Sequence, residues 1–321
     1  MTRSAIHKTN ALERGIRASF IHNGVVLSLH RFLVRLSSAA VAAFLWVFIF
    51  EYFAVLTPPV HALISTALLY ALSQTTTILL TPFALKRLRG GMRRGLVYGT
   101  LLLFAALAFF GALLVGVFPH GLVAIALLLG AYRALYRVPY SVEYTALAER
   151  GMPRLFLEIT LALAPLIAGV FLAIGGAPPQ LFFVAAFISL LALVPTFFIP
   201  NVHEDFAWGY QETFAHFAAP ENRRVLLTSV RQGMQGVSLF LVWPFVLLFL
   251  FAGSPKEIGA AFSLTLVIIL LFRASNRRVT VEEHADGGTF MDEYTALKEM
   301  GQALGRLVLA FALVLAFALL Q

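Results

Sequence analysis

The chain has 321 residues, of which 60% are hydrophobic and 12% charged, whereas about a quarter of the residues of an ordinary soluble domain are charged. With a mean hydropathy of +0.86 and 30 Phe residues, the composition excludes a soluble globular enzyme, because even a ~300-residue globule must cover a large wet surface. The absence of cysteine excludes disulfides, thiolate metal sites and a cysteine nucleophile. The solvent of this chain is therefore lipid.

Nine apolar runs dominate the chain, each bounded by Gly, Pro or charged residues, and most have the length of a membrane helix of about 20 residues. Runs such as 101–107 lack the polar–apolar alternation of a membrane barrel, so helices are favoured. The sequence predicts an all-α polytopic membrane protein, a helical bundle of about nine transmembrane helices. They are expected at 36–56, 60–85, 96–118, 121–142, 155–175, 180–200, 233–252, 258–272 and 303–320.

Basic residues gather in alternate connections between these spans. Five of them lie within 86–94, and others precede the first span or follow the fourth and eighth, whereas the opposite connections hold a single Lys. The positive-inside rule places the N-terminus in the cytoplasm and predicts a multi-pass protein of the inner (plasma) membrane. Residues 1–30 lack the apolar core of a secretory signal and are expected to form a cytoplasmic tail. The formal charge of +8 is thus a topology signal, and no nucleic acid is expected as a partner.

Two segments of the chain repeat. Residues 143–151 recur as 293–301 with seven of nine residues identical, and a weaker match aligns 73–80 with 263–270. The offsets are 150 and 190 residues, and their difference of 40 corresponds to about two membrane spans. We interpret 143–151 and 293–301 as the same cytoplasmic loop in two related halves, of which the second lacks a helical hairpin.

The repeat and the spans divide the chain into four parts. We expect a cytoplasmic tail at 1–30, a six-helix N-terminal bundle at 31–200, a polar cytoplasmic linker at 201–224 and an incomplete C-terminal bundle at 225–321. Six spans, a linker and a parallel, shortened second copy form the plan of a two-half transporter.

With this plan, the basic loop at 86–94, Arg133 in the fourth span and the segment Ala164–Gly169 in the fifth, the chain resembles the major facilitator superfamily. The resemblance implies counterparts of that family's helices one to eight and eleven, with a C-terminal half that is truncated or internally deleted. It also implies a gating loop formed by Lys86, Arg87, Arg93 and Arg94.

The function implied by the resemblance is secondary-active transport of an unknown small solute by alternating access, with an exporter as one form and with proton or cation coupling as an option. Besides the lipid bilayer, a second copy of the chain is a candidate partner, because a homo-oligomer would complete the cavity wall. The alternative is a non-transporting membrane protein, either a degenerate transporter or a membrane scaffold, which the missing hairpin favours. We expect no enzyme, catalytic residue, metal or cofactor, because the sequence contains neither a His-Glu-x-x-His motif nor a phosphate-binding loop.

Polar side chains inside the apolar runs mark the candidate site, because an ionised group at the bilayer centre costs about 2.5–3.5 kcal/mol on insertion scales. Arg133 is expected to contact an anionic or polar substrate, or Glu51 of the first span. Glu51 is itself a candidate proton or cation ligand, with an interfacial position as the alternative. Gln74, Gln232 and Gln235 are candidates for hydrogen bonds to the solute, and interhelical hydrogen bonds are the alternative for each.

Two further predictions concern helix association. Arg137 lies one turn from Arg133 and shares its face, and Glu158, near the cytoplasmic end of the antiparallel fifth span, comes to about the same depth. We therefore expect an Arg137–Glu158 ion pair that joins spans four and five. Pro165 and Gly169 are expected to form a packing motif at which a neighbouring helix approaches closely.

Overall fold

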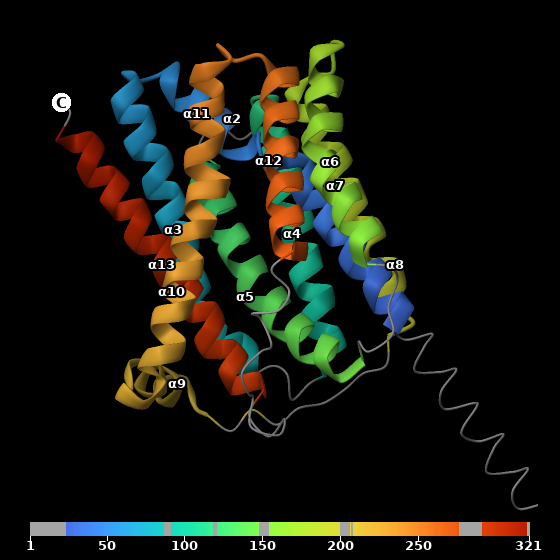
Figure 1. The fold of residues 1–321 in the computed structure, drawn as a ribbon, viewed down its shortest axis with the longest axis vertical. Helices are drawn as coiled ribbons and strands as arrows, with labels where there is room; N and C mark the ends of the chain where they lie inside the picture. The colour runs from blue at the N-terminus through green and yellow to red at the C-terminus, as the bar shows by residue number, and fades with distance from the viewer. Residues whose placement is uncertain are drawn as a thin grey trace, which may run out of the picture.

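The computed structural model of the chain describes residues 24–86, 91–117, 121–147, 154–199, 206, 208–275 and 291–319. Helices and their connecting turns make up this part of the chain, and it contains no strand. Eight of these helices are long and apolar enough to cross a membrane, and a further apolar helix, Leu157–Ala173, is shorter. The prediction of an all-α polytopic membrane protein is confirmed. The long helices run side by side along the long axis of the molecule (Figure 1).

The helices follow one another along the chain with short connections. An initial helix at 24–41 is followed by α2 (Leu45–Ala54), α3 (Pro59–Lys86), α4 (Met92–Leu114), α5 (Leu122–Leu147), α6 (Arg154–Ala173), α7 (Pro178–Leu191), α8 (Leu193–Thr196), α9 (Tyr210–Ala218), η2 (Pro220–Asn222), α10 (Arg223–Val237), η3 (Ser238–Val242), α11 (Trp243–Leu250), α12 (Pro255–Ser275) and α13 (Met291–Ala318). We refer to the helices up to α8 as the first half and to α10–α13 as the second half.

The initial helix begins earlier than the sequence suggested. Residues 24–30, expected as the end of the tail, are helical. Leu27, Val34 and Val41 recur at a spacing of seven and are all buried, so one face of this helix packs inward from its first turns. His30 is also buried, and its Nδ1 lies 2.7 Å from the carbonyl oxygen of Ala192.

Proline residues set several helix boundaries. Pro59, Pro178 and Pro255 are the first residues of α3, α7 and α12, where the missing N–H has no intrahelical acceptor to lose. Pro244 is the second residue of α11 and follows the π-helical turn η3. A proline inside a continuous helix removes one hydrogen bond and crowds the preceding turn, and the wider π-turn accommodates this change.

The repeated segment is a helix in the second half and does not form the expected loop. Residues 293–301 form the first turns of α13, and Ala296, Leu297 and Met300 are buried there. Their spacing of one and three residues places them on one face of a helix. In the first half, residues 143–147 continue α5, and residues 148–151 lie outside the described part of the chain.

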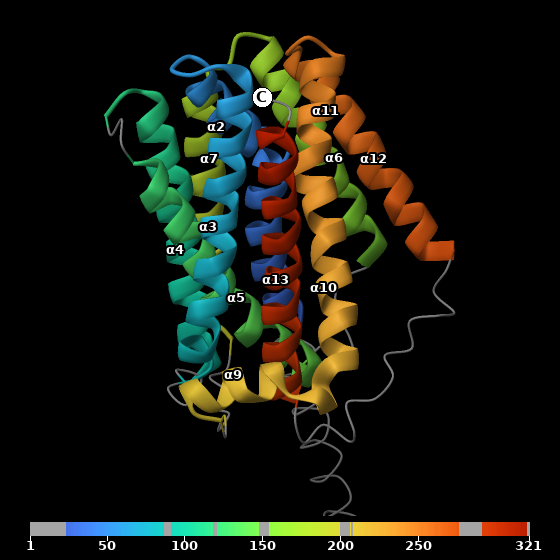
Figure 2. The ribbon, with the colours of Figure 1, turned by 90° about the vertical axis from the view of Figure 1, so that its left-hand side faces the viewer.

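Two helix pairs supply most of the contact between the two halves, with smaller contacts of α5 with α13 and of α2 with α11. α13 packs along α3, and α12 packs along α6, while α13 also packs against α10 of its own half. Figure 2 shows α13 between α3 and α10. The weaker repeat match relates 73–80 on α3 to 263–270 on α12, and the stronger one, at its offset of 150 residues, relates α6 to the part of α13 that follows residue 301. Exchanging the repeats therefore exchanges the α3–α13 contact with the α12–α6 contact, as a twofold relation between the halves requires.

The α6–α12 contact is a close crossing of two helix backbones. A Cβ atom on Gly169 would lie 2.4 Å from the carbonyl oxygen of Pro255, and a Cβ atom on Gly259 would lie 2.4 Å from the carbonyl oxygen of Pro165. Only glycine permits this distance, in the manner of small-residue interfaces between membrane helices. The packing motif formed by Pro165 and Gly169 lies at this crossing.

The linker between the halves lies across one end of the bundle. α9 runs nearly at right angles to the long helices (Figures 1 and 2). Just before it, Phe206 is only 2% exposed and belongs to a small apolar cluster with residues of α3, α4, α5 and α13. These residues are Leu85, Met92, Val138 and Ala296. The linker is thereby anchored to both halves.

Candidate functional site

A polar stretch of α3 forms one wall of the candidate site. Ser73, Gln74, Thr77 and Thr81 are all fully buried. The Thr77 and Thr81 hydroxyls donate to carbonyl oxygens one turn earlier, of Ser73 at 3.0 Å and of Thr77 at 2.7 Å. Threonine hydroxyls satisfied within their own helix are tolerated in a membrane, and Ser73, Gln74 and Thr77 also contact other helices.

α5 approaches this stretch closely because residue 130 is glycine. A Cβ atom at Gly130 would lie 2.4 Å from the Ser73 carbonyl oxygen and 2.6 Å from the Thr76 Cβ. The Thr77 hydroxyl also donates to the Gly130 carbonyl oxygen at 3.2 Å. Three residues further along, Arg133 donates from Nη1 to the Ser73 hydroxyl at 2.9 Å. The backbone contact thus brings Arg133 into hydrogen-bonding reach of α3.

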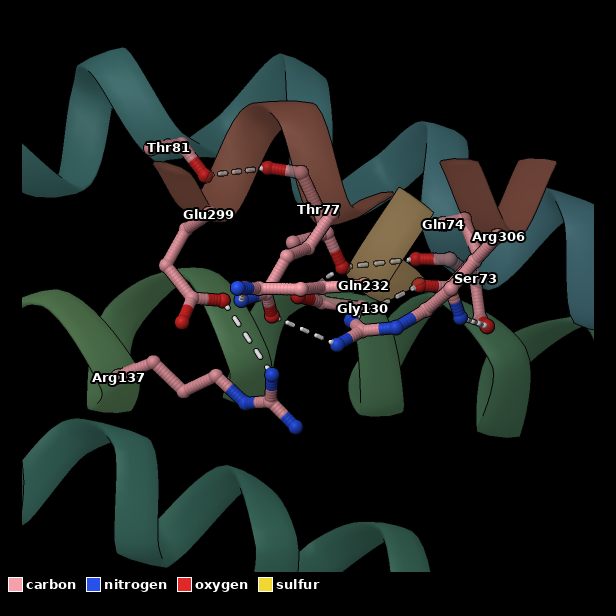
Figure 3. A network of polar contacts seen from close by, with 10 residues as sticks. Ser73, Gln74, Thr77, Thr81, Gly130, Arg137, Gln232, Glu299 and Arg306 are labelled. Atoms are coloured by element: carbon pink, nitrogen blue, oxygen red, sulfur yellow. Dashed lines mark hydrogen bonds and ion pairs between the residues drawn. The ribbon is translucent and has the colours of Figure 1, made fainter. Parts of the chain in front are cut away.

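Arg306 enters the same site from α13. It is only 9% exposed. Its Nη1 donates to Gln74 Oε1 at 3.5 Å, and its Nη2 donates to Gln302 Oε1 at 3.1 Å. Gln302 in turn donates to Gln232 Oε1 on α10 at 3.2 Å, and Gln74 donates to the Ser73 hydroxyl at 3.0 Å. Figure 3 shows Gln74, Ser73 and Arg306 at one end of the network and Gln232 nearer its middle.

At the other end of the network, Arg137 on α5 lies 3.3 Å from Glu299 on α13. The Arg137 side chain is 37% exposed, and the Glu299 side chain is 12% exposed. This pair joins the two halves, because α5 belongs to the first and α13 to the second.

The predicted Arg137–Glu158 ion pair is corrected by these contacts. Glu158 on α6 pairs with Arg35 of the initial helix, with a distance of 2.8 Å from Arg35 Nη2 to Glu158 Oε2. The prediction compared only the expected depths of Arg137 and Glu158 in the membrane. Lateral packing decides the partner, and α13, not α6, carries the carboxylate that contacts this arginine.

The candidate solute residues divide into two groups. The network brings together Arg133, Gln74 and Gln232, the first two directly around Ser73 and the third through Gln302 and Arg306. Glu51 lies exposed near the end of α2, and Gln235 lies exposed on α10. Arg133 donates to the Ser73 hydroxyl, not to Glu51.

The expected gating loop is described only at its edges. Lys86 is exposed at the end of α3, and Arg94 is exposed in the first turn of α4. The guanidinium of Arg93 lies 6.0 Å from the ring centre of Phe197, a distance typical of cation–π contacts. Arg87 lies outside the described residues.

Sequence reasoning missed Glu299, Gln302 and Arg306, which supply the second half's share of the network. The signal was present, because spacings of three and four residues place these three side chains on one face of a helix. It was overlooked because 293–301 was interpreted as a loop and 303–320 as an apolar span.

The network carries an excess of positive charge. Of the residues described in it, Arg133, Arg137 and Arg306 are cationic, and Glu299 alone is anionic. Neither Arg133 nor Arg306 forms an ion pair within the described part of the chain. Ionised groups within a membrane span are costly and mark functional sites. No group of His, Asp or Glu that could hold a metal ion occurs among the residues that the structure describes.

Comparison of the sequence with protein-family models gave no match, and comparison with curated proteins gave none either. The contacts of this chain alone therefore carry the functional argument.

Proposed function

We propose that this protein is a secondary-active transporter of the major facilitator type, which moves a small solute across the inner membrane by alternating access. The observation that carries the proposal is the charged network of Arg133, Arg137, Glu299 and Arg306, which is partly buried where apolar helices of the two halves meet. Polar groups at the junction of two repeated bundles are the usual position of a transporter's binding site.

The contacts between the halves support this mechanism. α3–α13 and α6–α12 are exchanged by the repeat, so the halves can rock about an axis between the two contacts. At the α6–α12 crossing, Gly169 and Gly259 present backbone to backbone, which leaves few interlocked side chains to resist such a movement. The proposal also includes proton or cation coupling, export as the direction of transport, and a second copy of the chain that completes the wall of the cavity.

A membrane scaffold is the alternative, and the network argues against it. Association of spans requires small residues and shape complementarity, which the Gly169–Gly259 crossing supplies without any charge. Three arginines inside the spans add a cost of about 2.5–3.5 kcal/mol each on insertion scales. The Arg137–Glu299 pair offsets part of this cost by joining two helices, whereas Arg133 and Arg306 have no ion-pair partner in the described part of the chain.

The absence of native cysteine permits a direct test by spin labelling of introduced cysteine pairs. Leu56→Cys with Lys256→Cys places exposed labels at the outer ends of the two halves, and Lys86→Cys with Arg224→Cys places exposed labels at their cytoplasmic ends. We expect two distance populations for each pair by electron–electron double resonance. Conditions that lengthen the outer distance should shorten the inner one.

A control pair within the first half keeps this test specific. Leu56→Cys with Val117→Cys places both labels at the outer end of one half, and its distance should stay single and constant. Single, invariant distances for the outer and inner pairs under changes of pH and of sodium gradient in proteoliposomes would overturn alternating access and leave the scaffold.

A further inference from the structure

We propose that Arg133 and Arg306 together bind a small oxyanion, the carboxylate or phosphate group of the solute, between the two halves. That the oxyanion is part of the transported solute rests on the proposed function. That an anion binds here depends only on the contacts of the two arginines.

The guanidinium groups of Arg133 and Arg306 both lack a counter-ion among the described residues. Arg133 donates to the Ser73 hydroxyl, and Arg306 donates to the amide oxygens of Gln74 and Gln302. Each partner is a neutral oxygen that accepts a hydrogen bond without cancelling charge. Arg137 has Glu299 as its partner, so the network as described is short of two negative charges.

The N–H donors of the two arginines lie close to one another. Arg133 and Arg306 reach adjacent residues of α3, Ser73 and Gln74, which are joined by their own hydrogen bond of 3.0 Å. A guanidinium group carries five N–H donors in a planar fork, and the contacts above occupy one donor of Arg133 and two of Arg306. The remaining forks suit a carboxylate or a phosphate, which accept paired hydrogen bonds from arginine.

Basic residues of α10 line the cytoplasmic side of the site. α10 carries exposed polar residues on one face, at spacings of three and four residues. They are Arg224, Thr228, Arg231 and Gln235. This helix reaches the site, since a Cβ atom at Gly236 would lie 3.6 Å from Arg306 Nε. Arg224 and Arg231 form no ion pair in the described part of the chain, and like-signed charges along a path attract anions toward it.

A bound oxyanion would supply the missing charge and would bridge α5 of the first half to α13 of the second. Because the anion interacts with both halves at once, its binding would favour the arrangement in which Arg133 and Arg306 lie close together. A solute without negative charge would leave both guanidinium groups unpaired in that arrangement.

The test is direct binding to the purified full-length chain in detergent by isothermal titration calorimetry. The probes are inorganic phosphate and succinate at constant ionic strength set with sodium chloride. We expect at least one of them to bind, and the two arms distinguish a phosphate from a carboxylate preference. Arg133→Gln and Arg306→Gln should each weaken binding at least tenfold. Lys256→Gln removes one positive charge at an exposed position outside the network and should alter the Kd less than twofold.

A further variant keeps the proposal falsifiable if an arginine variant fails to fold. Glu299→Gln removes the one carboxylate of the network and should tighten oxyanion binding severalfold. Absence of binding by both probes, affinities that the Arg133 and Arg306 variants leave unchanged, or an equal effect of chloride alone would overturn the oxyanion site. Label distances that alternate without oxyanion binding would refute this inference and keep the transporter, whereas binding with invariant distances would keep the site and refute transport.

Discussion

Two glycines of α10, one closely packed and one not, allow a quantitative test of the structure. Gly233 and Gly236 lie within one turn of the same helix, yet their surroundings differ. A Cβ atom at Gly233 would lie 2.1 Å from the Gln302 carbonyl oxygen and 2.9 Å from its carbonyl carbon, whereas a Cβ atom at Gly236 would meet only Arg306 Nε, at 3.6 Å. Alanine at Gly233 must therefore push α13 away, and alanine at Gly236 fits in ordinary contact.

The expected magnitudes follow from these distances. To bring the Gly233→Ala Cβ from 2.1 Å to an ordinary contact of 3.4 Å, the two backbones must separate, and overpacking of this kind costs about 1–3 kcal/mol. The obstacle is main chain that cannot rotate away, which places the cost in the upper part of that range. Replacement of helical glycine by alanine favours the helix by about 1 kcal/mol in both variants, so this contribution cancels in the comparison.

We therefore expect Gly233→Ala to be about 2–3 kcal/mol less stable than Gly236→Ala. The assay is reversible unfolding in mixed micelles of dodecyl sulfate and a mild detergent, followed by circular dichroism. Equal unfolding midpoints for the two variants would refute the close α10–α13 crossing, and with it the position of Arg306 beside Gln74.

Three other predictions concern separate features. Arg137→Gln and Glu299→Gln should each lower the free energy of unfolding. The double variant should lose less than the sum of the two losses, with a coupling energy of about 0.5–3 kcal/mol in a double-mutant cycle. Strictly additive losses would contradict the ion pair. Phe206→Ala empties a buried position in the linker and should cost about 3–5 kcal/mol of unfolding free energy, whereas a loss below 1 kcal/mol would mean that the linker is not anchored. Lys256→Cys should react with a membrane-impermeant thiol reagent on intact cells and Gln211→Cys only after permeabilisation, and the reverse pattern would invert the proposed topology.

The membrane spans were predictable from the sequence because one physical quantity, apolar length relative to bilayer thickness, decides them. The close crossing at Pro165 and Gly169 was predictable for a similar reason, since small residues in an apolar helix have few other uses. Helix starts were less accurate where polar residues belong to a helix that reaches beyond the lipid, as in α10, which begins at Arg223 although the apolar run begins at 233.

The pairing of charges could not be read from the sequence. Apolar runs give the depth of a residue in the membrane but not its lateral neighbours, and several ionisable groups share one depth. Glu158 and Glu299 were both available to Arg137, and the packing of α13 beside α5 selected Glu299. The same limit hid the link from Arg306 to Gln74, which are 232 positions apart.

The hydrogen bonds of the network differ in length. Those that join helices of one half are shorter than those that join the two halves. Within the first half, Arg133 binds Ser73 at 2.9 Å and Thr77 binds Gly130 at 3.2 Å. Between the halves, Arg137 lies 3.3 Å from Glu299 and Arg306 lies 3.5 Å from Gln74, beyond the usual 2.7–3.2 Å of a strong N–H···O bond. A rocking movement of the halves would strain these longer contacts, whereas the 2.8 Å hydrogen bond from the Leu166 N–H to the Ser263 hydroxyl holds the α6–α12 crossing. Through α13, the second half thus supplies the Glu299 carboxylate and the Arg306 guanidinium to these contacts.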